Sequence, residues 1–178
     1  FQGEELGMTN IRLDISQHVD IETLNVYNER IEQGYDPEEV MASIHARSRD
    51  NARTPMQWTA GEKAGFTTGD AWMPLNPNYT EINAEAALAD PDSVFHYYRK
   101  LIELRKSKNV FRSGSFTLLC PENEDIFAYT RDTEKEHLLV VCNFTDKTLS
   151  FDAPENFQGA EMILSNYNDG CSELMPYE

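Results

Sequence analysis

The chain has 178 residues and carries 31 acidic against 15 basic side chains, which gives a formal net charge of −16. This excess of negative charge disfavours a nucleic-acid-binding surface, an anionic-membrane-binding surface and, weakly, a phosphorylated substrate. Hydrophobic residues make up 40% of the chain, which is ordinary for a globular protein. No apolar run approaches the ~18 residues that a transmembrane helix needs. We therefore expect a globular protein with neither a nucleic-acid nor a membrane partner.

The cysteines and histidines are few and scattered. They are Cys120, Cys142, Cys171, His18, His45, His96 and His137. An odd number of cysteines without CxxC spacing indicates free thiols in a reducing compartment, so we expect a cytoplasmic protein. The histidines lack metal-ligand spacing and are interpreted as ordinary surface or packing residues. We expect no metal and no cofactor.

Residues 1–8 are predicted to be the end of a buried strand that enters a loop. Two adjacent carboxylates, Glu4 and Glu5, lie in this segment. Successive side chains of a strand point to opposite faces, so these two carboxylates cannot act on one bond. We expect a structural role for Glu4, behind the site rather than in the chemistry.

Two helices are predicted next. The first covers residues 20–33, with Asp20 as its N-cap and Gly34 at its end. The second begins with Asp36 as N-cap and Pro37 at the first helical position. Both show apolar residues at helical spacing. The second helix is expected to run directly into an arginine-rich stretch.

That stretch, residues 49–58, reads RDNARTPMQW. Thr54 precedes a proline, which pushes it out of the α region, so Arg49 and Arg53 are expected where a helix runs out into a loop. Guanidinium groups beside Gln57 and Trp58 suit a site that donates hydrogen bonds to a polyhydroxylated ligand. A solvated cluster of salt bridges is the alternative that composition alone favours.

The rest of the first part contains a long loop and one more helix. Residues 59–80 are rich in glycine, proline, threonine and asparagine without periodicity, and a loop of this length is typically functional. Residues 91–106 are predicted to form a helix capped by Asp90, with an apolar stripe. The stripe consists of Val94, Tyr97, Tyr98, Leu101 and Ile102.

After residue 112 the pattern changes to short runs of β-branched and aromatic residues separated by turns. The predicted strands are residues 115–120, 126–131, 138–144, 149–151 and 161–166. We expect an antiparallel β-domain at residues 113–178, behind a first domain at residues 1–112. The aromatic side chains of these runs are interpreted as core, which argues against a carbohydrate-binding module with an exposed aromatic row. They are Phe116, Phe127, Tyr129, Phe144 and Phe151.

Six segments, in one order, resemble the neutral α-glucosidases of the α-amylase superfamily (glycoside hydrolase family 13), most closely the oligo-1,6-glucosidases. They are FQGEELGMTN at 1–10, DIETLN at 20–25, RDNARTPMQW at 49–58, GFTTG at 65–69, NPNY at 76–79 and EIN at 81–83. The resemblance implies the C-terminal end of a TIM (β/α)8 barrel, with the end of strand eight and the following helices. A small antiparallel Greek-key β-domain would follow, with its last strand truncated.

The family's retaining mechanism uses two carboxylates about 5–5.5 Å apart. The resemblance places these carboxylates on earlier barrel strands, upstream of residue 1. The chain is therefore expected to be the C-terminal part of a hydrolase of short oligosaccharides. It is expected to be inactive alone, to contain no catalytic residue and to have the N-terminal barrel portion of the same polypeptide as its partner.

The resemblance also implies roles for individual residues. Arg49 and Arg53 are expected to bind substrate, with Arg49 at the glucose subsite and Arg53 also bracing the loop through Asp50 or another acid. Glu4, Asp50, Gln57 and Trp58 are expected to support them. Trehalose-6-phosphate hydrolase, sucrose isomerase, α-1,4-glucosidase and a non-catalytic superfamily member remain alternatives.

Overall fold

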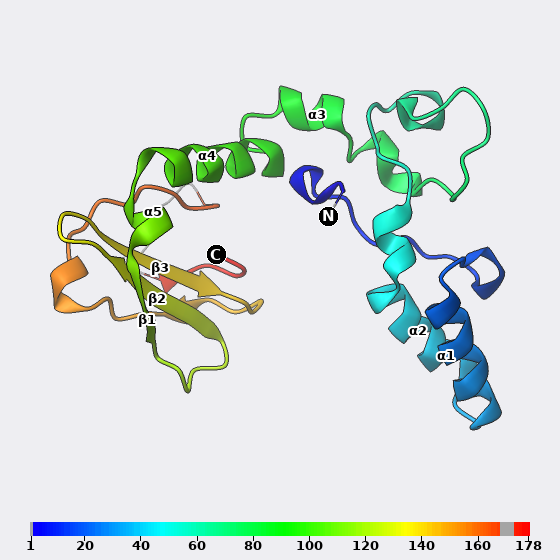
Figure 1. The fold of residues 1–178 in the computed structure, drawn as a ribbon, viewed down its shortest axis with the longest axis horizontal. Helices are drawn as coiled ribbons and strands as arrows, with labels where there is room; N and C mark the ends of the chain where they lie inside the picture. Colours follow the sequence, from blue (N-terminus) through cyan, green and yellow to red (C-terminus); the bar gives the residue numbers. More distant parts are fainter. Residues whose placement is uncertain (1, 168–172) are drawn as a thin grey trace. The chain divides into compact units, whose positions relative to one another are not determined.

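The structure is a computed structural model that describes residues 2–167 and 173–178 (Figure 1). The chain divides into two compact units, Phe1–Arg99 and Lys100–Glu178, and each is described by itself. Among the described residues, no helix has the length and apolar character needed to cross a membrane. Cys120 and Cys142 are free thiols, whereas Cys171 lies outside the described residues.

The described part of residues 1–8 contains no strand, so the prediction that this segment includes the end of a buried strand is wrong for these residues. Glu4–Leu6 forms a 3₁₀ helix instead. Gly3 and Gly7 flank it with φ angles of 89° and 73°, in a left-handed region that is incompatible with an extended strand. Successive residues of a 3₁₀ helix point about 120° apart, so Glu4 and Glu5 still do not share a face.

Helices α1 (Ile21–Glu32) and α2 (Pro37–Arg47) confirm the predicted pair and pack against each other (Figure 1). The side chain of Asp20 caps α1, and that of Asp36 caps α2 with a 2.7 Å bond from the backbone N–H of Glu38. Gly34, at φ 84°, follows the end of α1. The caps satisfy backbone donors that the first turn of a helix leaves free.

Residues 59–80 contain neither an α-helix nor a strand, as predicted. Two short 3₁₀ helices, Glu62–Gly65 and Pro77–Thr80, interrupt the loop. Part of the loop packs into the interior of the first unit, since Met73 is buried with two residues of the N-terminal segment, Ile11 and Leu13. The loop is therefore anchored to the same unit as the arginine stretch.

Helix α3 (Ala84–Ala89) was not predicted, and α4 (Val94–Ser107) begins three residues later than expected. The reason is local, because Asp90 ends α3 and forms a turn by accepting from the backbone N–H of Asp92 at 3.0 Å. Asp90 therefore does not cap α4, which corrects the prediction. The boundary between the two compact units falls within α4.

The second unit begins with the C-terminal part of α4, and a short helix, α5 (Val110–Ser113), then leads into a three-stranded antiparallel sheet. Its strands β1 (Ser115–Leu119), β2 (Ile126–Asp132) and β3 (His137–Asn143) are neighbours in chain order (Figure 1). Tyr129 of β2 lies opposite Leu118 of β1 and Val140 of β3. This sheet confirms the predicted β-domain and three of its strands.

Two short strands, β4 (Leu149–Ser150) and β5 (Glu173–Leu174), form a separate antiparallel pair. The strand predicted at residues 161–166 is wrong. Side chains in and beside this segment bond the C-terminal residues instead: Ser165 Oγ donates to Glu178 at 2.9 Å, and Asn166 donates to the backbone of Tyr177 at 2.9 Å. These side-chain hydrogen bonds hold the segment in place of the backbone hydrogen bonds of a strand pair.

The interpretation of the aromatic residues as core is wrong for Phe116, Phe127 and Phe144, which are all exposed. On β2 the buried positions are Ile126, Ala128 and Thr130, so the alternation of a strand turns Phe127 outward. The ring of Phe116 instead packs on that of Tyr129 across the β1–β2 pair, with 5.2 Å between centroids. The sequence established the period of the strand but not which of its faces is inside.

Candidate functional site

The arginine stretch begins where α2 ends, as the sequence predicted. Ser48 terminates α2, and its side chain caps a 3₁₀ helix, Arg49–Arg53, by accepting from the backbone N–H of Asp50 at 3.3 Å. Thr54 then leaves the helix in an extended conformation, with ψ 151°, as expected for a residue before proline. The 3₁₀ helix presents Asp50 and Arg53 to the segment that precedes α1.

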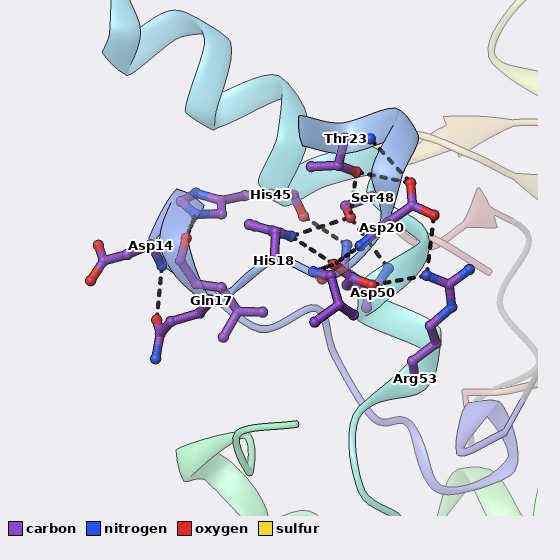
Figure 2. Close-up of polar contacts among 12 residues, drawn as sticks. Asp14, Gln17, His18, Asp20, Thr23, His45, Ser48, Asp50 and Arg53 are labelled. Carbon is purple, nitrogen blue, oxygen red and sulfur yellow. Dashed lines mark hydrogen bonds and ion pairs between the residues drawn. The ribbon is translucent and has the colours of Figure 1, made fainter. Parts of the chain in front are cut away.

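Asp50 is the most connected side chain in this region and has no solvent-exposed surface. Its Oδ2 accepts three hydrogen bonds: from His18 Nδ1 at 3.0 Å, from the backbone N–H of Val19 at 2.9 Å and from that of Asp20 at 3.1 Å. Figure 2 shows these donors converging on one carboxylate. A buried charge is tolerated only when it is bonded in this way.

Arg53 connects two carboxylates. Its Nη1 donates to Asp50 Oδ1 at 3.0 Å and to Asp20 Oδ1 at 3.1 Å. The other oxygen of Asp20 accepts from the backbone N–H and the hydroxyl of Thr23 at 3.1 and 3.2 Å, which ties the cluster to the first turn of α1. The expectation that Arg53 braces the loop through Asp50 is confirmed, and Asp20 is a second brace.

We refer to His18, Asp20, Thr23, Ser48, Asp50 and Arg53 as the Asp50 network (Figure 2). Ser48 joins it through a 3.0 Å contact between its hydroxyl and that of Thr23. The network links α1 and the 3₁₀ helix within one unit. It leaves the side chain of Arg53 38% exposed.

Hydrogen bonding sets the charge state of the network. Burial raises the pKa of Asp50, but the bonds from Val19, Asp20, His18 and Arg53 outweigh this, so its pKa lies below the ordinary value. Burial likewise raises the pKa of Asp20, and the bonds from Thr23 and Arg53 lower it by more. Bonding to Asp50 and then to Asp20 raises the pKa of Arg53. Both carboxylates are therefore ionised beside a permanent cation.

Arg49 lies outside the Asp50 network. It forms an ion pair with Glu22 of α1, and the two side chains are 65% and 64% exposed. Both residues border a hollow of about 400 Å³ beside α1 and α2, whose polar lining also includes Arg47, Ser48 and Asp20. An exposed pair of this kind contributes little to stability. Arg49 as a substrate-binding residue therefore stays a prediction.

Gln57 and Trp58, the last two residues of the arginine stretch, differ in burial. Gln57 is fully buried and donates to Asn78 Oδ1 at 3.1 Å and to the backbone of Ile82, which holds the loop 59–80 against the arginine stretch. Trp58 is half-exposed, and its backbone bonds Ala64 at 2.9 Å. Glu4 is exposed on its 3₁₀ helix. Its supporting role, like that of Trp58, stays a prediction.

His18 is the residue that sequence reasoning missed. The sequence suggested an ordinary surface or packing histidine, whereas the structure places it in the interior, bonded to a carboxylate 32 positions away. The only local signal was its position two residues before the N-cap of α1. Among the residues that the structure describes, no group of three His, Cys, Asp or Glu side chains could hold a metal ion.

Comparisons with known proteins agree with this architecture. A model of the α-amylase catalytic domain matches residues 1–114, and a model of the maltogenic amylase C-terminal domain matches residues 116–167. An oligo-1,6-glucosidase of Parageobacillus thermoglucosidasius is 51% identical over 98% of this chain and 32% of its own length. One of Halalkalibacterium halodurans is 50% identical over 100% of this chain and 33% of its own length.

A solved structure is also similar. The trehalose-6-phosphate hydrolase of Bacillus licheniformis superposes with a TM-score of 0.91 and 43% identity, over 99% of this chain and 34% of that chain. The present chain thus spans about a third of the length of the relatives that it matches. These matches confirm the predicted fold, the end of a TIM barrel followed by a small β-domain. The chain belongs to the α-amylase family.

Proposed function

We propose that this chain is the C-terminal portion of a retaining α-glucosidase that hydrolyses terminal α-1,6 bonds of short oligosaccharides, with α-1,4 bonds as the alternative linkage. The observation that carries the proposal is the likeness to proteins named oligo-1,6-glucosidase, which extends over the whole chain. The polyhydroxylated substrate also suits a partly exposed guanidinium that is already fixed in place. Trehalose-6-phosphate hydrolase, sucrose isomerase and a non-catalytic family member are the alternatives.

The chemistry requires two carboxylates on either side of the scissile bond, about 5–5.5 Å apart for retention. We place them in the part of the protein outside this chain, which is also the chain's partner. Within residues 1–178 we assign substrate contacts to Arg49 and Arg53. Asp50 and Gln57 hold the stretch from the inside, and Trp58 and Glu4 support it from its edges.

Of the two arginines, Arg53 is the one whose guanidinium is already fixed in place for binding. Its Nη1 bonds two carboxylates whose remaining oxygens are bonded elsewhere, so the plane of the guanidinium is set before substrate arrives. A donor that needs no reorganisation contributes most to binding and to stabilising the transition state. Arg49 is exposed and paired with an exposed Glu22, so it must reorient to bind a sugar.

The test is an assay of the full-length protein with isomaltose, maltose, trehalose 6-phosphate and sucrose. We expect the highest kcat/KM for isomaltose, with glucose released as the α-anomer when followed by NMR. A preference for trehalose 6-phosphate would support the phosphohydrolase alternative, and conversion of sucrose into an isomer would support the isomerase. Complete inactivity with intact folding would support the non-catalytic alternative.

A cytoplasmic location forms part of the proposal. Cys120 and Cys142 are free thiols, and free thiols are typical of proteins in reducing compartments. Fractionation of the native host tests this directly. Recovery of the protein in the culture medium or the cell envelope would contradict it.

A further inference from the structure

The loop that follows the arginine stretch contains a hollow of about 590 Å³ to which the proposed function assigns no role. One aromatic ring, one carboxylate, one ammonium group and two hydroxyls border it. The lining residues are Glu62, Lys63, Gly65, Phe66, Thr67 and Thr68. Ligand sites in proteins typically occupy about 300–1,000 Å³ and combine apolar surface with a few polar groups. The size and the lining of this hollow therefore suit a small polar ligand.

A left-handed turn gives the hollow its shape. Lys63 and Ala64 have φ angles of 51° and 54°, in a region that residues other than glycine seldom adopt. The carbonyl of Ala64 accepts from the backbone N–H groups of Trp58 and Thr59 at 2.9 and 3.1 Å, which fastens the turn to the end of the arginine stretch. Across the loop, Lys63 Nζ donates to the carbonyl of Gly69 at 2.6 Å. These bonds hold the hollow in shape before a ligand arrives.

The free side chains of the hollow indicate the chemistry of its ligand. Phe66 is 45% exposed and offers a flat apolar surface. The side chains of Glu62 and Thr68 form no hydrogen bond or ion pair with residues 2–167 and 173–178, so they can bond a ligand. The ammonium of Lys63 already bonds Gly69 and lies 3.7 Å from an oxygen of Asp70, which leaves little positive charge for an anion. A neutral pyranose, with C–H groups on one face and hydroxyls around its rim, fits this combination.

We propose that the hollow is a subsite for a glucosyl residue of a longer oligosaccharide. The sugar ring stacks on Phe66, and its hydroxyls bond Glu62 and Thr68. The inference rests on the proposed function, because it takes the substrate to be an α-linked oligosaccharide, and it extends that function to chain length. The two glucosyl residues of isomaltose flank the cleaved bond, so only a longer chain brings a further residue to the hollow.

The test compares isomaltose with isomaltotetraose as substrates of the full-length enzyme, with kcat and KM measured for each. Phe66→Leu keeps apolar bulk but removes the flat ring, whereas Phe66→Tyr keeps the ring. We expect Phe66→Leu to lower the ratio of kcat/KM for isomaltotetraose to that for isomaltose about fivefold or more, mainly through a higher KM for the longer substrate. Phe66→Tyr should retain the wild-type ratio.

Trp72→Leu is the matched control, since its ring belongs to the same loop and is 73% exposed but does not line the hollow. It should leave the ratio unchanged. An unchanged ratio in Phe66→Leu, an equal fall in Phe66→Tyr, or an equal fall in Trp72→Leu would each overturn the subsite, while hydrolysis of isomaltose by the wild type would leave the glucosidase proposal intact. A wild-type enzyme that hydrolyses neither substrate would overturn the proposed function itself.

Discussion

His18 Nδ1 donates to Asp50 Oδ2 at 3.0 Å, and both side chains are buried, at 2% and 0% exposure. This bond joins the segment before α1 to the 3₁₀ helix after α2. The same carboxylate holds Arg53, one of the two arginines that we propose to contact substrate. Stability and proposed binding therefore depend on the same carboxylate.

Asp50→Asn in the full-length protein should lower the free energy of unfolding at pH 7 by about 3 kcal/mol, because the buried donors lose a charged acceptor. An amide also offers Arg53 an N–H where it needs an oxygen. Urea unfolding at pH 7 measures the loss. Asp36→Asn is the matched control, since asparagine caps a helix as well as aspartate does, and it should leave stability nearly unchanged.

The acid side of the stability profile follows from the two lowered pKa values. A carboxyl whose pKa is depressed by folding contributes stability that is fully present above its unfolded pKa of about 3.9 and lost as the pH falls through the folded pKa. The Tm of the wild type should therefore fall steeply below about pH 4. In Asp50→Asn the contribution of Asp50 to this decline should be missing. Parallel Tm profiles from pH 7 to pH 2.5 would contradict the assignment.

Arg53→Ala should lower kcat/KM on isomaltose by about 10²-fold, because a fixed donor that we propose to contact the sugar is lost. Arg53→Lys should recover little of it, since an ammonium presents a single nitrogen, whereas the guanidinium keeps Nε and Nη2 as further donors beyond the Nη1 that bonds the two carboxylates. Arg49→Ala should cost less, because its exposed guanidinium is not held in place. Glu22→Gln, which releases Arg49, is its matched control. A larger loss for Arg49→Ala than for Arg53→Ala would reverse the proposed ranking.

Residues 1–178 alone should not hydrolyse a nitrophenyl α-glucoside or isomaltose, because we place the catalytic carboxylates outside this chain. The assay requires fragment expressed in a host that lacks its own α-glucosidases. Full-length protein prepared in the same way is the positive control. Turnover by the fragment would show that residues within this chain carry the chemistry.

The isolated fragment should also self-associate. Apolar side chains along α4 are exposed in the chain alone, among them Val94, Leu101 and Ile102, and exposed apolar surface costs roughly 25 cal/mol per Å². Light scattering should detect oligomers, and Leu101→Glu should reduce them. Full-length protein should be monodisperse in the same buffer. A monodisperse wild-type fragment with one sharp unfolding transition would contradict this expectation.

The sequence alone predicted the elements whose causes are local. Asp20 and Asp36 cap their helices, and Thr54 leaves the helical region before a proline, because these effects act over a few residues. The brace from Arg53 to Asp50 was also predictable, since the two lie three positions apart. Family resemblance added the barrel end and the β-domain, which the comparisons confirm.

The tertiary structure decided what depends on distant partners. Strand periodicity left the inner face of β2 open, and the packing of Ile126 and Ala128 decided it against Phe127. Residues 161–166 have the composition of a strand but bond the C-terminal segment through their side chains. His18 meets Asp50 only because α1 and α2 pack together, which brings a donor to a carboxylate 32 positions away. No local rule specifies such a contact, because its stability comes from burial that exists only once the chain has folded.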